Sequence, residues 1–248
     1  MGAPIAIRLA ESNHQVCVAA RSAARLDAAL SAHPSISRTT DLGEAVSGAG
    51  LVIVAVPPAA TEPTIAKIAP SLAPGALVAT LSPHTSLARL GELLPRGVYA
   101  ARLMPNTALR LGASMTFISF AADVPADVQT MLIENMTVMG QVTVIAEHLM
   151  PGATALCSCG IAYAMRYVRA AVEGAVQMGF DPEVATRAVA ATLAGASAIL
   201  LETPTPHPEA EIDRVTTPGG TTIRGLNAME AAGFTHAVIA GLIASSDE

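Results

Sequence analysis

Aromatic and basic residues are scarce in this chain of 248 residues. It has no Trp, three Tyr and four Phe, and it has a net charge of −6 without any run of basic residues. Proteins that bind nucleic acids present basic patches, often with aromatic side chains among them. The composition therefore excludes a nucleic-acid partner and leaves small molecules and other protein chains.

Cysteine is also scarce. Cys17, Cys157 and Cys159 are too few, and too poorly spaced, for a disulfide framework or a zinc site. For the C-x-C pair, packing is favoured over a redox role because that spacing is uncommon in redox pairs. The six histidines are scattered and are interpreted as surface or loop residues: His14, His33, His84, His148, His207 and His236. We expect no metal and a reduced, cytoplasmic protein.

Charged residues make up only 14% of the chain, whereas hydrophobic residues make up 52%, with a mean hydropathy of +0.49. Two explanations compete, which are membrane insertion and helices that partner subunits bury on all sides. The best membrane candidate, residues 184–201, contains Arg187 and consists mostly of small residues. No secretory signal opens the sequence. We therefore favour a homo-oligomer and expect no membrane contact.

Short apolar segments alternate with helical segments over the first 146 residues. The expected strands are Gln15–Ala19, Ser35–Thr39, Leu51–Val56, Ala76–Leu81, Val98–Leu103, Met115–Phe120 and Gln141–Ile145. The expected helices include Pro4–Ser12, Ala23–Ala32, Pro63–Ile68 and Pro125–Met139. Segment Leu51–Val56 is apolar on both faces, as in a central parallel strand. The pattern predicts an α/β, Rossmann-like domain over residues 1–146, with a parallel, doubly wound sheet.

Beyond Glu147 the strand pattern stops, and residues 147–248 are predicted to form an all-α domain. Its expected helices are Pro151–Gly179, Pro182–Glu202, Pro208–Arg214, Gly219–Ala232 and Phe234–Ser245. Helices this rich in Ala do not easily bury their apolar faces alone. We expect these C-terminal helices to mediate dimerisation.

The chain opens at Met1-Gly2-Ala3-Pro4, inside a segment expected to be helical. A doubly wound nucleotide-binding domain ordinarily begins with a strand and a G-x-G-x-x-G turn that holds the pyrophosphate. Gly2 is typical of the third glycine of such a turn, and the strand before it is not in this sequence. We expect two unpaired strand edges and weakened cofactor binding, from a start placed too late or from a true truncation.

Residues after the next strand indicate which cofactor is used. The strand is followed by Arg21, Ser22 and Arg25, with no acid before Asp27. A domain built for NAD places Asp or Glu here for the ribose 2′-hydroxyl, whereas guanidinium groups suit a 2′-phosphate. The segment therefore predicts NADPH, with NADH as the alternative. The competing interpretation is a solvated pair of arginines at a helix start.

The most informative segment is Val215-Thr216-Thr217-Pro218-Gly219-Gly220-Thr221-Thr222. Glycines at a helix entry allow a ligand to approach closely, and the first N–H groups of the helix can face a carboxylate. The hydroxyl groups on both sides suit an anion beside an amine or imine. The alternative is a Thr-rich helix cap without a ligand.

This segment and three others resemble one family. The stretch Asp213–Glu230 resembles the signature of pyrroline-5-carboxylate reductases. Ala55-Val56-Pro57-Pro58 is similar to the family's A-V-K-P turn, Arg102–Thr107 to its R-x-M-P-N-T, and Leu156–Tyr163 to its L-S-G-S-G-P-A-Y. The matches extend from Met1 to about Ile243, which is nearly the whole chain.

The resemblance implies NADPH-dependent hydride transfer to the imine of 1-pyrroline-5-carboxylate, which yields L-proline. It assigns Thr222 to the ring nitrogen as the catalytic group, and Thr217 with Gly219, Gly220 and Thr221 to the substrate carboxylate. Cofactor-binding residues in the same scheme are Gly2, Arg21, Ser22, Arg25, Ala55, Val56, Pro57, Pro105 and Asn106. It further implies an interlocked homodimer, or a multiple of dimers, with each active site between a cofactor domain and a neighbour's helices.

Several positions depart from the family pattern. Pro57 replaces a lysine, Cys157 and Cys159 replace serines, Ser158 replaces a glycine, and Ile161 replaces a proline. These changes leave two alternatives, a non-catalytic oligomeric or regulatory paralogue and a reductase of another small cyclic imine. A β-hydroxyacid dehydrogenase is disfavoured because such enzymes use a lysine of the helical domain and this chain has only Lys67. For Tyr163, helix packing is favoured over a catalytic acid.

Overall fold

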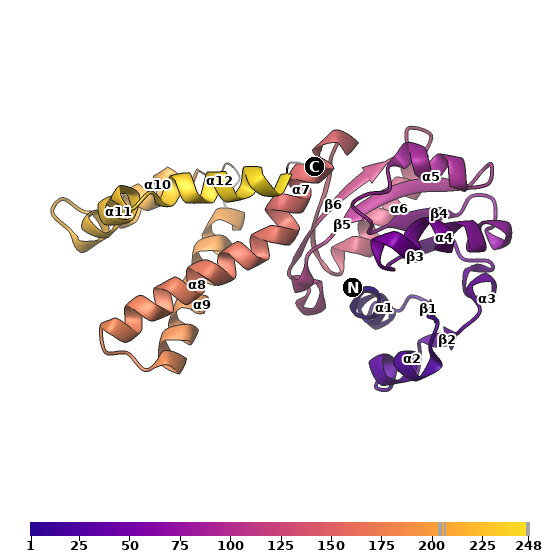
Figure 1. Cartoon of the computed structure of the whole chain (residues 1–248), viewed down its shortest axis with the longest axis horizontal. Helices are drawn as coiled ribbons and strands as arrows, with labels where there is room; N and C mark the ends of the chain where they lie inside the picture. Colours follow the sequence, from indigo (N-terminus) through magenta and orange to yellow (C-terminus); the bar gives the residue numbers. More distant parts are fainter. Residues whose placement is uncertain (203–204, 206, 247–248) are drawn as a thin grey trace. The chain divides into compact units, whose positions relative to one another are not determined.

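The computed structural model describes residues 1–202, 205 and 207–246 (Figure 1). It divides into two compact units. One comprises Met1–Ser158 with Ser245 and Ser246, and the other comprises Cys159–Ala244. The domain boundary expected at residue 146 stays a prediction.

The first unit is built from alternating strands and helices (Figure 1). Its strands are β1 (Cys17–Ala19), β2 (Ser37–Thr39), β3 (Leu51–Val54), β4 (Leu77–Thr80), β5 (Tyr99–Met104), β6 (Ser114–Phe120) and β7 (Gly140–Val144). Its α-helices are α1 (Gly2–Glu11), α2 (Ala23–Leu30), α3 (Leu42–Val46), α4 (Pro58–Ile68), α5 (Leu87–Leu93), α6 (Ala126–Thr137) and α7 (Met150–Ala153). Short 3₁₀ helices are η1 (Ala69–Ser71), η2 (Thr107–Leu111) and η3 (Glu147–Leu149). Each of the seven expected strands is present.

The strands form two sheets. Strands β1 and β2 pair in parallel, and a five-stranded sheet has the order β3-β4-β5-β6-β7. Pairing is parallel except between β5 and β6, where Ala101 lies opposite Phe120. The parallel-dominated, Rossmann-like fold is thus confirmed, with β5 and β6 as its one antiparallel pair among the described strands. The link from Met104 to Ser114 is too short for a crossover helix, and Gly112 reverses the chain in the left-handed conformation, with φ +70°.

Two apolar layers cover the five-stranded sheet. One layer joins α1 and α6 to the sheet through Ile5, Leu9, Leu132 and Met136. The other joins α4 and α5 through Ile65, Ile68, Leu87 and Leu90. Strand β5 is buried from Ala100 to Met104 because helices cover both of its faces.

Some helix boundaries differ from the expectation. Helix α4 begins at Pro58 instead of Pro63, so Pro63 lies inside the helix. Helices α3 and α5 also lie between expected strands, but the sequence pattern gave no bounds for them. They are stabilised by N-caps, since the Asp41 side chain accepts from Gly43 N and Glu44 N, and Ser86 Oγ accepts from Arg89 N.

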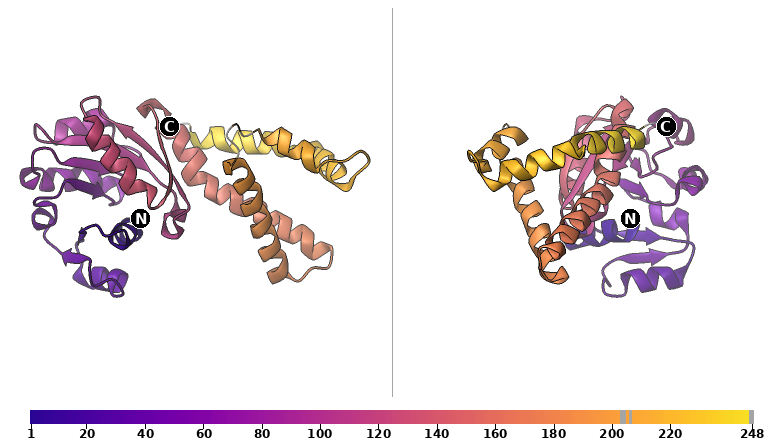
Figure 2. Two further views of the ribbon diagram at one scale, coloured as in Figure 1. Left: turned by 180° about the vertical axis from the view of Figure 1, so that it is seen from behind. Right: turned by 60° about the vertical axis from the view of Figure 1, so that its left-hand side comes forward.

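The second unit is all-helical, as expected, and contains α8 (Gly160–Gln177), α9 (Pro182–Glu202), α10 (Pro208–Val215), α11 (Thr221–Ala231) and α12 (Phe234–Ser246). Helices α8 and α9 contact each other, and the right view of Figure 2 shows them opening as a V from the turn that joins them. The expected helix Pro151–Gly179 is instead α7, a π-helical turn over Thr154–Cys159, and α8. Among the described residues of this unit only Ala185 is buried, so its apolar side chains are left open to a partner.

Gly140 provides a test of the register between β6 and β7. Its φ is +134°, and a Cβ atom there would lie 2.5 Å from the backbone nitrogen of Ser114. We expect Gly140→Ala to lower the free energy of unfolding by about 3 kcal/mol or more, through backbone strain and overlap. Urea unfolding followed by circular dichroism measures the change.

Gly91 is the matched control. It lies exposed within α5, and nothing lies within 4 Å of an added Cβ atom. Gly91→Ala should raise the free energy of unfolding by about 0.5–1 kcal/mol. Equal effects of the two substitutions would contradict the close β6–β7 pairing.

Candidate active site

The expected cofactor residues of the first unit gather at one edge of the sheet. Strands β3, β4 and β5 are parallel neighbours, so their carboxyl ends lie at the same edge. Ala55, Val56 and Pro57 follow β3, and Pro105 and Asn106 follow β5. The two segments therefore flank the end of β4, where ligands bind in open α/β sheets.

Helix α1 begins against this edge. A Cβ atom on Gly2 would lie 3.2 Å from Ala55 Cβ, so glycine allows the helix start to pack closely against the end of β3, and a side chain there would require a small shift. The first N–H groups of a helix carry partial positive charge. The structure thus brings Gly2 and Ala55 together at a place suited to an anion.

The three residues assigned to the 2′-phosphate lie between β1 and α2. Ser22 is the N-cap of α2, and its Oγ accepts a hydrogen bond from Arg25 N at 3.4 Å. Arg21 and Arg25 are exposed. This geometry is compatible with both expected alternatives, which are binding of the 2′-phosphate by these residues and a solvated pair of arginines.

Asn106 is held rigidly where β5 ends. It is 8% exposed, its backbone N donates to Ser114 Oγ at 3.1 Å, and its side-chain Oδ1 accepts from Ala108 N at 3.0 Å. The second contact caps η2. The side-chain amide is therefore pre-organised, which favours a role in orienting a ligand.

An ion pair that the sequence did not predict connects three segments beside this edge. Arg102 Nη1 lies 3.0 Å from Glu147 Oε1, and Arg102 Nη2 donates to Pro83 O at 2.5 Å. The same Glu147 oxygen accepts from Leu87 N at 2.6 Å. Glu147 thus joins the start of α5 and β5 to the segment before α7, and Arg102 adds the β4–α5 loop. In the sequence, Glu147 was recognisable only as an isolated acidic residue after the last expected strand.

A hollow of about 350 Å³ opens at the start of α4. It is lined by Pro58, Ala59, Glu62, Pro63, His84 and Thr85. Its wall combines the first turn of α4, after β3, with the loop that Arg102 holds after β4. The hollow therefore lies at the carboxyl edge, next to the expected cofactor segment that ends at Pro57.

The threonine- and glycine-rich segment forms a tight turn in the helical unit. Gly220 N donates to Thr217 O at 2.9 Å, Pro218 is the second residue of the turn, and Gly219 has a φ of +72°. These features define a type II turn, which requires glycine at its third position. Helix α11 begins immediately afterwards with Thr221 and Thr222.

This turn is compact around its glycines. A Cβ atom on Gly220 would lie 2.5 Å from Thr217 Oγ1. The structure therefore brings Thr217 and Gly220 together beside the first turn of α11. The expected cofactor residues belong to the other unit.

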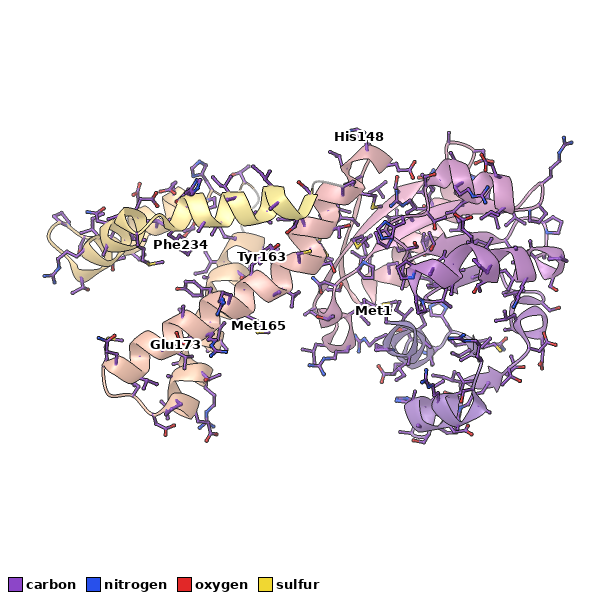
Figure 3. The ribbon with its side chains drawn as sticks, in the orientation of Figure 1. Met1, His148, Tyr163, Met165, Glu173 and Phe234 are labelled. Atoms are coloured by element: carbon purple, nitrogen blue, oxygen red, sulfur yellow. The ribbon has the colours of Figure 1, made fainter. Side chains whose placement is uncertain are left out.

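Tyr163 contacts its own unit. Its hydroxyl donates to Gly241 O at 3.4 Å, and the rings of Tyr167 and Phe234 meet edge to face at 6.4 Å. Figure 3 shows Tyr163 on α8 and Phe234 at the start of α12. These contacts agree with the packing role expected for Tyr163. In the part of the chain that the structure describes, no group of His, Cys, Asp and Glu is arranged to hold a metal ion.

Comparisons with known proteins agree across the chain. A family model described as pyrroline-5-carboxylate reductase dimerisation matches residues 147–248, and one described as NADP oxidoreductase coenzyme F420-dependent matches residues 1–83. Pyrroline-5-carboxylate reductase 2 of Dictyostelium discoideum is 34% identical over 224 residues, which cover 85% of this chain and 75% of that protein. The chain belongs to the pyrroline-5-carboxylate reductase family.

Other relatives agree with this assignment. Pyrroline-5-carboxylate reductase 1 of Dictyostelium discoideum is 38% identical over 221 residues, which cover 85% of this chain but only 40% of that protein. A reductase structure from Coxiella burnetii is 25% identical with a TM-score of 0.90, covering 99% of this chain and 92% of that one. A Plasmodium falciparum enzyme with NADP bound has a TM-score of 0.85 and the same coverage at 20% identity, which shows the shared fold.

Two departures from the reductase family's sequence pattern have clear local structures. Pro57, in place of the family's lysine, is the N-cap of α4 with φ −54° and ψ 147°. Cys157 is buried in the π-helical turn, and burial raises the pKa of its thiol to about 11. A thiol that stays protonated at neutral pH is a poor nucleophile, so packing or hydrogen bonding suits Cys157 better than redox chemistry.

The Arg102–Glu147 ion pair can be tested for its contribution to the stability of the carboxyl edge of the sheet. The side chains are 10% and 32% exposed, so Glu147→Gln leaves a largely buried guanidinium without its counter-ion. We expect the free energy of unfolding to fall by about 1–2 kcal/mol, less than for a fully buried pair because water reaches Glu147. Urea unfolding measures the loss.

The control for this prediction is the exposed pair between Arg89 and Glu62, whose atoms lie 2.7 Å apart. Glu62→Gln makes the same chemical change where both partners are solvated, so the unfolding midpoint should not change. If both variants lose the same stability, the Arg102–Glu147 pair does not organise the edge.

Proposed function

We propose that this chain reduces 1-pyrroline-5-carboxylate to L-proline, with NADPH as the preferred hydride donor and NADH as the alternative. The observation that supports this function most directly is the Thr217–Gly220 turn at the start of α11, in a chain of this family. The Thr217 hydroxyl lies close to Gly220, and the first N–H groups of α11 follow directly after it. That arrangement suits a small carboxylate that carries an adjacent ring nitrogen.

The cofactor supplies the hydride, and the protein positions the imine. A protonated C=N group is already electrophilic, so the chain needs only to hold the ring about 3–3.5 Å from the nicotinamide carbon. Pro105 and Asn106 are proposed to lie beside the nicotinamide, and Ala55, Val56 and Pro57 along the adjoining ribose. Gly2 permits α1 to begin close to the cofactor's phosphates.

Substrate contacts are proposed on the turn and the first residues of α11. Thr222 hydrogen-bonds the ring nitrogen, while the Thr217 hydroxyl and Thr221 N–H hold the carboxylate. The N–H of Gly220 already donates to Thr217 O within the turn. The contribution of Gly219 and Gly220 is therefore chiefly to keep the approach free of side chains.

Dimerisation is proposed through the helical unit, which completes each active site with helices of a second copy. Helix α9 is long and apolar enough to cross a membrane by length and composition alone, and only 6% of its apolar window is buried. It also contains Glu183 and Arg187, whose side chains pair at 3.4 Å. Together with its many small residues, this favours burial against another chain in a cytoplasmic oligomer.

Activity is tested by supplying the purified chain with pyrroline-5-carboxylate and NADPH and measuring both NADPH oxidation and proline. Expression in a proline-requiring bacterium that lacks its own reductase gives the matching growth test. The expected results are proline formation and growth without added proline. Folded protein that binds NADPH without forming proline would instead favour the non-catalytic alternative, which the comparisons do not favour.

Arg21→Ala tests the choice of cofactor. Loss of a charged phosphate partner should weaken NADPH binding by on the order of 1.5–3 kcal/mol, whereas NADH has no 2′-phosphate to lose. Calorimetric titration with both cofactors measures the difference. Arg96→Ala removes the same charge from an exposed position before β5, away from the carboxyl edge, and should affect neither cofactor. Equal weakening of both cofactors by Arg21→Ala would mean that Arg21 does not contact the phosphate.

Thr222→Val and Thr217→Val separate the two substrate contacts. Valine keeps the branched shape, so each variant should fold. Thr222→Val should lower kcat by about 10²-fold, the lower end for a positioned proton donor or acceptor. Thr217→Val should mainly raise KM because it removes a contact to the carboxylate. Steady-state kinetics distinguishes them, and normal turnover by Thr222→Val would remove this residue from the site.

A further inference from the structure

The hollow at the start of α4 has polar lining residues that the expected cofactor segments do not include. Its volume is about 350 Å³, and it is lined by Pro58, Ala59, Glu62, Pro63, His84 and Thr85. The first turns of α4 form one wall, and the loop between β4 and α5 forms the other. A hollow of this size, with apolar walls and a few polar groups, is typical of a site for a small molecule.

His84 borders the hollow from a loop that is fixed on both sides of it. Before His84, Pro83 O accepts a hydrogen bond from Arg102 Nη2 at 2.5 Å. After it, Thr85 is buried, and its Oγ1 donates to Ser82 Oγ at 3.3 Å. The backbone that carries His84 is therefore pre-organised, which suits a side chain that recognises a ligand.

Glu62 brings a carboxylate to the opposite wall. Arg89 of α5 donates to it from Nε at 3.0 Å and from Nη2 at 2.7 Å, and both hydrogen bonds end on Glu62 Oε2. Among the described residues, none donates to the other oxygen, Oε1. The bonds from Arg89 lower the pKa of Glu62, so its carboxyl group is ionised at neutral pH. An ionised carboxylate with a spare oxygen accepts from hydroxyl groups and repels phosphate groups.

We propose that this hollow binds the ribose of the cofactor's nicotinamide half, with Glu62 and His84 as the partners of its two hydroxyl groups. The inference rests on the proposed function, which places this ribose along the segment that ends at Pro57. Pro58, the first lining residue of the hollow, follows that segment directly. Neither Glu62 nor His84 was among the cofactor residues expected from the sequence.

The chemistry of the hollow selects this ribose from the other parts of the cofactor. The pyrophosphate and the 2′-phosphate are anions, which the carboxylate of Glu62 disfavours. The nicotinamide is proposed to lie beside Pro105 and Asn106, which follow β5. Ribose hydroxyl groups donate readily to a carboxylate, as they do to the acidic residue of dinucleotide-binding domains. The imidazole of His84 offers a ring nitrogen to the second hydroxyl group.

Three ligands test this site by calorimetric titration of the full-length protein. NADPH carries both the ribose and the nicotinamide, 2′-phospho-ADP-ribose carries this ribose without the nicotinamide, and adenosine 2′,5′-bisphosphate carries neither. Glu62→Gln and His84→Ala should each weaken the first two ligands about three- to tenfold, because each variant loses one hydrogen bond to the ribose, and should leave the third unchanged. The proposal requires this pattern in both variants. Equal weakening of all three ligands, weakening of NADPH alone, or no weakening overturns it.

Matched controls remove the same groups outside the hollow. Glu92→Gln removes the other carboxylate that pairs with Arg89, at 2.7 Å, and His14→Ala removes an exposed imidazole after the end of α1. Neither control should change the affinity for any of the three ligands. If Glu92→Gln weakens NADPH as much as Glu62→Gln does, the effect comes from the Arg89 bridge, and the proposal is overturned.

A further variant fills the hollow without removing a polar group. Ala59 is exposed at the second position of α4 and lines the hollow, whereas Ala66 is exposed on the same helix outside it. Both positions are exposed, so both leucine variants should fold. Ala59→Leu should weaken NADPH and 2′-phospho-ADP-ribose about tenfold because its side chain occupies the place of the ribose, and Ala66→Leu should weaken neither. Unchanged affinity in Ala59→Leu overturns the proposal.

The proposed function and the ribose site fail differently. Wild-type protein that binds NADPH without forming proline contradicts the proposed reaction, and the titrations still decide the ribose site. Wild-type protein that binds none of the three ligands contradicts both. Wild-type protein that forms proline, with Glu62, His84 and Ala59 variants that keep full affinity for NADPH, contradicts only the ribose site.

Discussion

Strand β5 is buried between a parallel neighbour, β4, and an antiparallel neighbour, β6. The position of the expected cofactor residues at the carboxyl edge of the sheet depends on this burial. Parallel pairing with β4 brings the carboxyl end of β5 to the common edge, and antiparallel pairing with β6 requires the chain to turn back at once. Pro105 and Asn106 occupy that reversal and are themselves buried. Because the strand cannot slide without exposing Ala101 and Leu103, the position of Asn106 is set by the core.

The polar groups around β5 follow from the same burial. A guanidinium on a covered strand needs partners, and Arg102 finds a carboxylate and a carbonyl group in two other segments. Ser114 and Cys157 satisfy backbone groups at the reversal. Each partner comes from a different part of the chain, which is why the site was only partly visible in the sequence.

The hydrophobic pattern of the sequence was sufficient to predict the strands, since each is a short apolar segment between turn residues. It gave no bounds for α3 and α5, whose five and seven residues are stabilised by Asp41 and Ser86 caps more than by an apolar stripe. It also missed the antiparallel direction of β6, which depends on the left-handed Gly112. At the site, motifs indicated Asn106 and Thr222 by resemblance, but the Glu147 contact spans 45 residues to Arg102 and leaves no local pattern.

The helical unit differs from the first unit because many of its apolar side chains are exposed to solvent. Met178 and Leu201 are more than 70% exposed, and α12 carries exposed Val238, Ile239 and Ile243. Burial of such side chains stabilises the folded state by about 25 cal/mol per Å² of apolar surface. If these side chains stayed in water, the Ala-rich helices would lose their main source of stability. A second copy of the chain that covered the exposed apolar faces of these helices would supply this stabilisation. The proposed substrate turn and the proposed dimer interface would then belong to one set of helices.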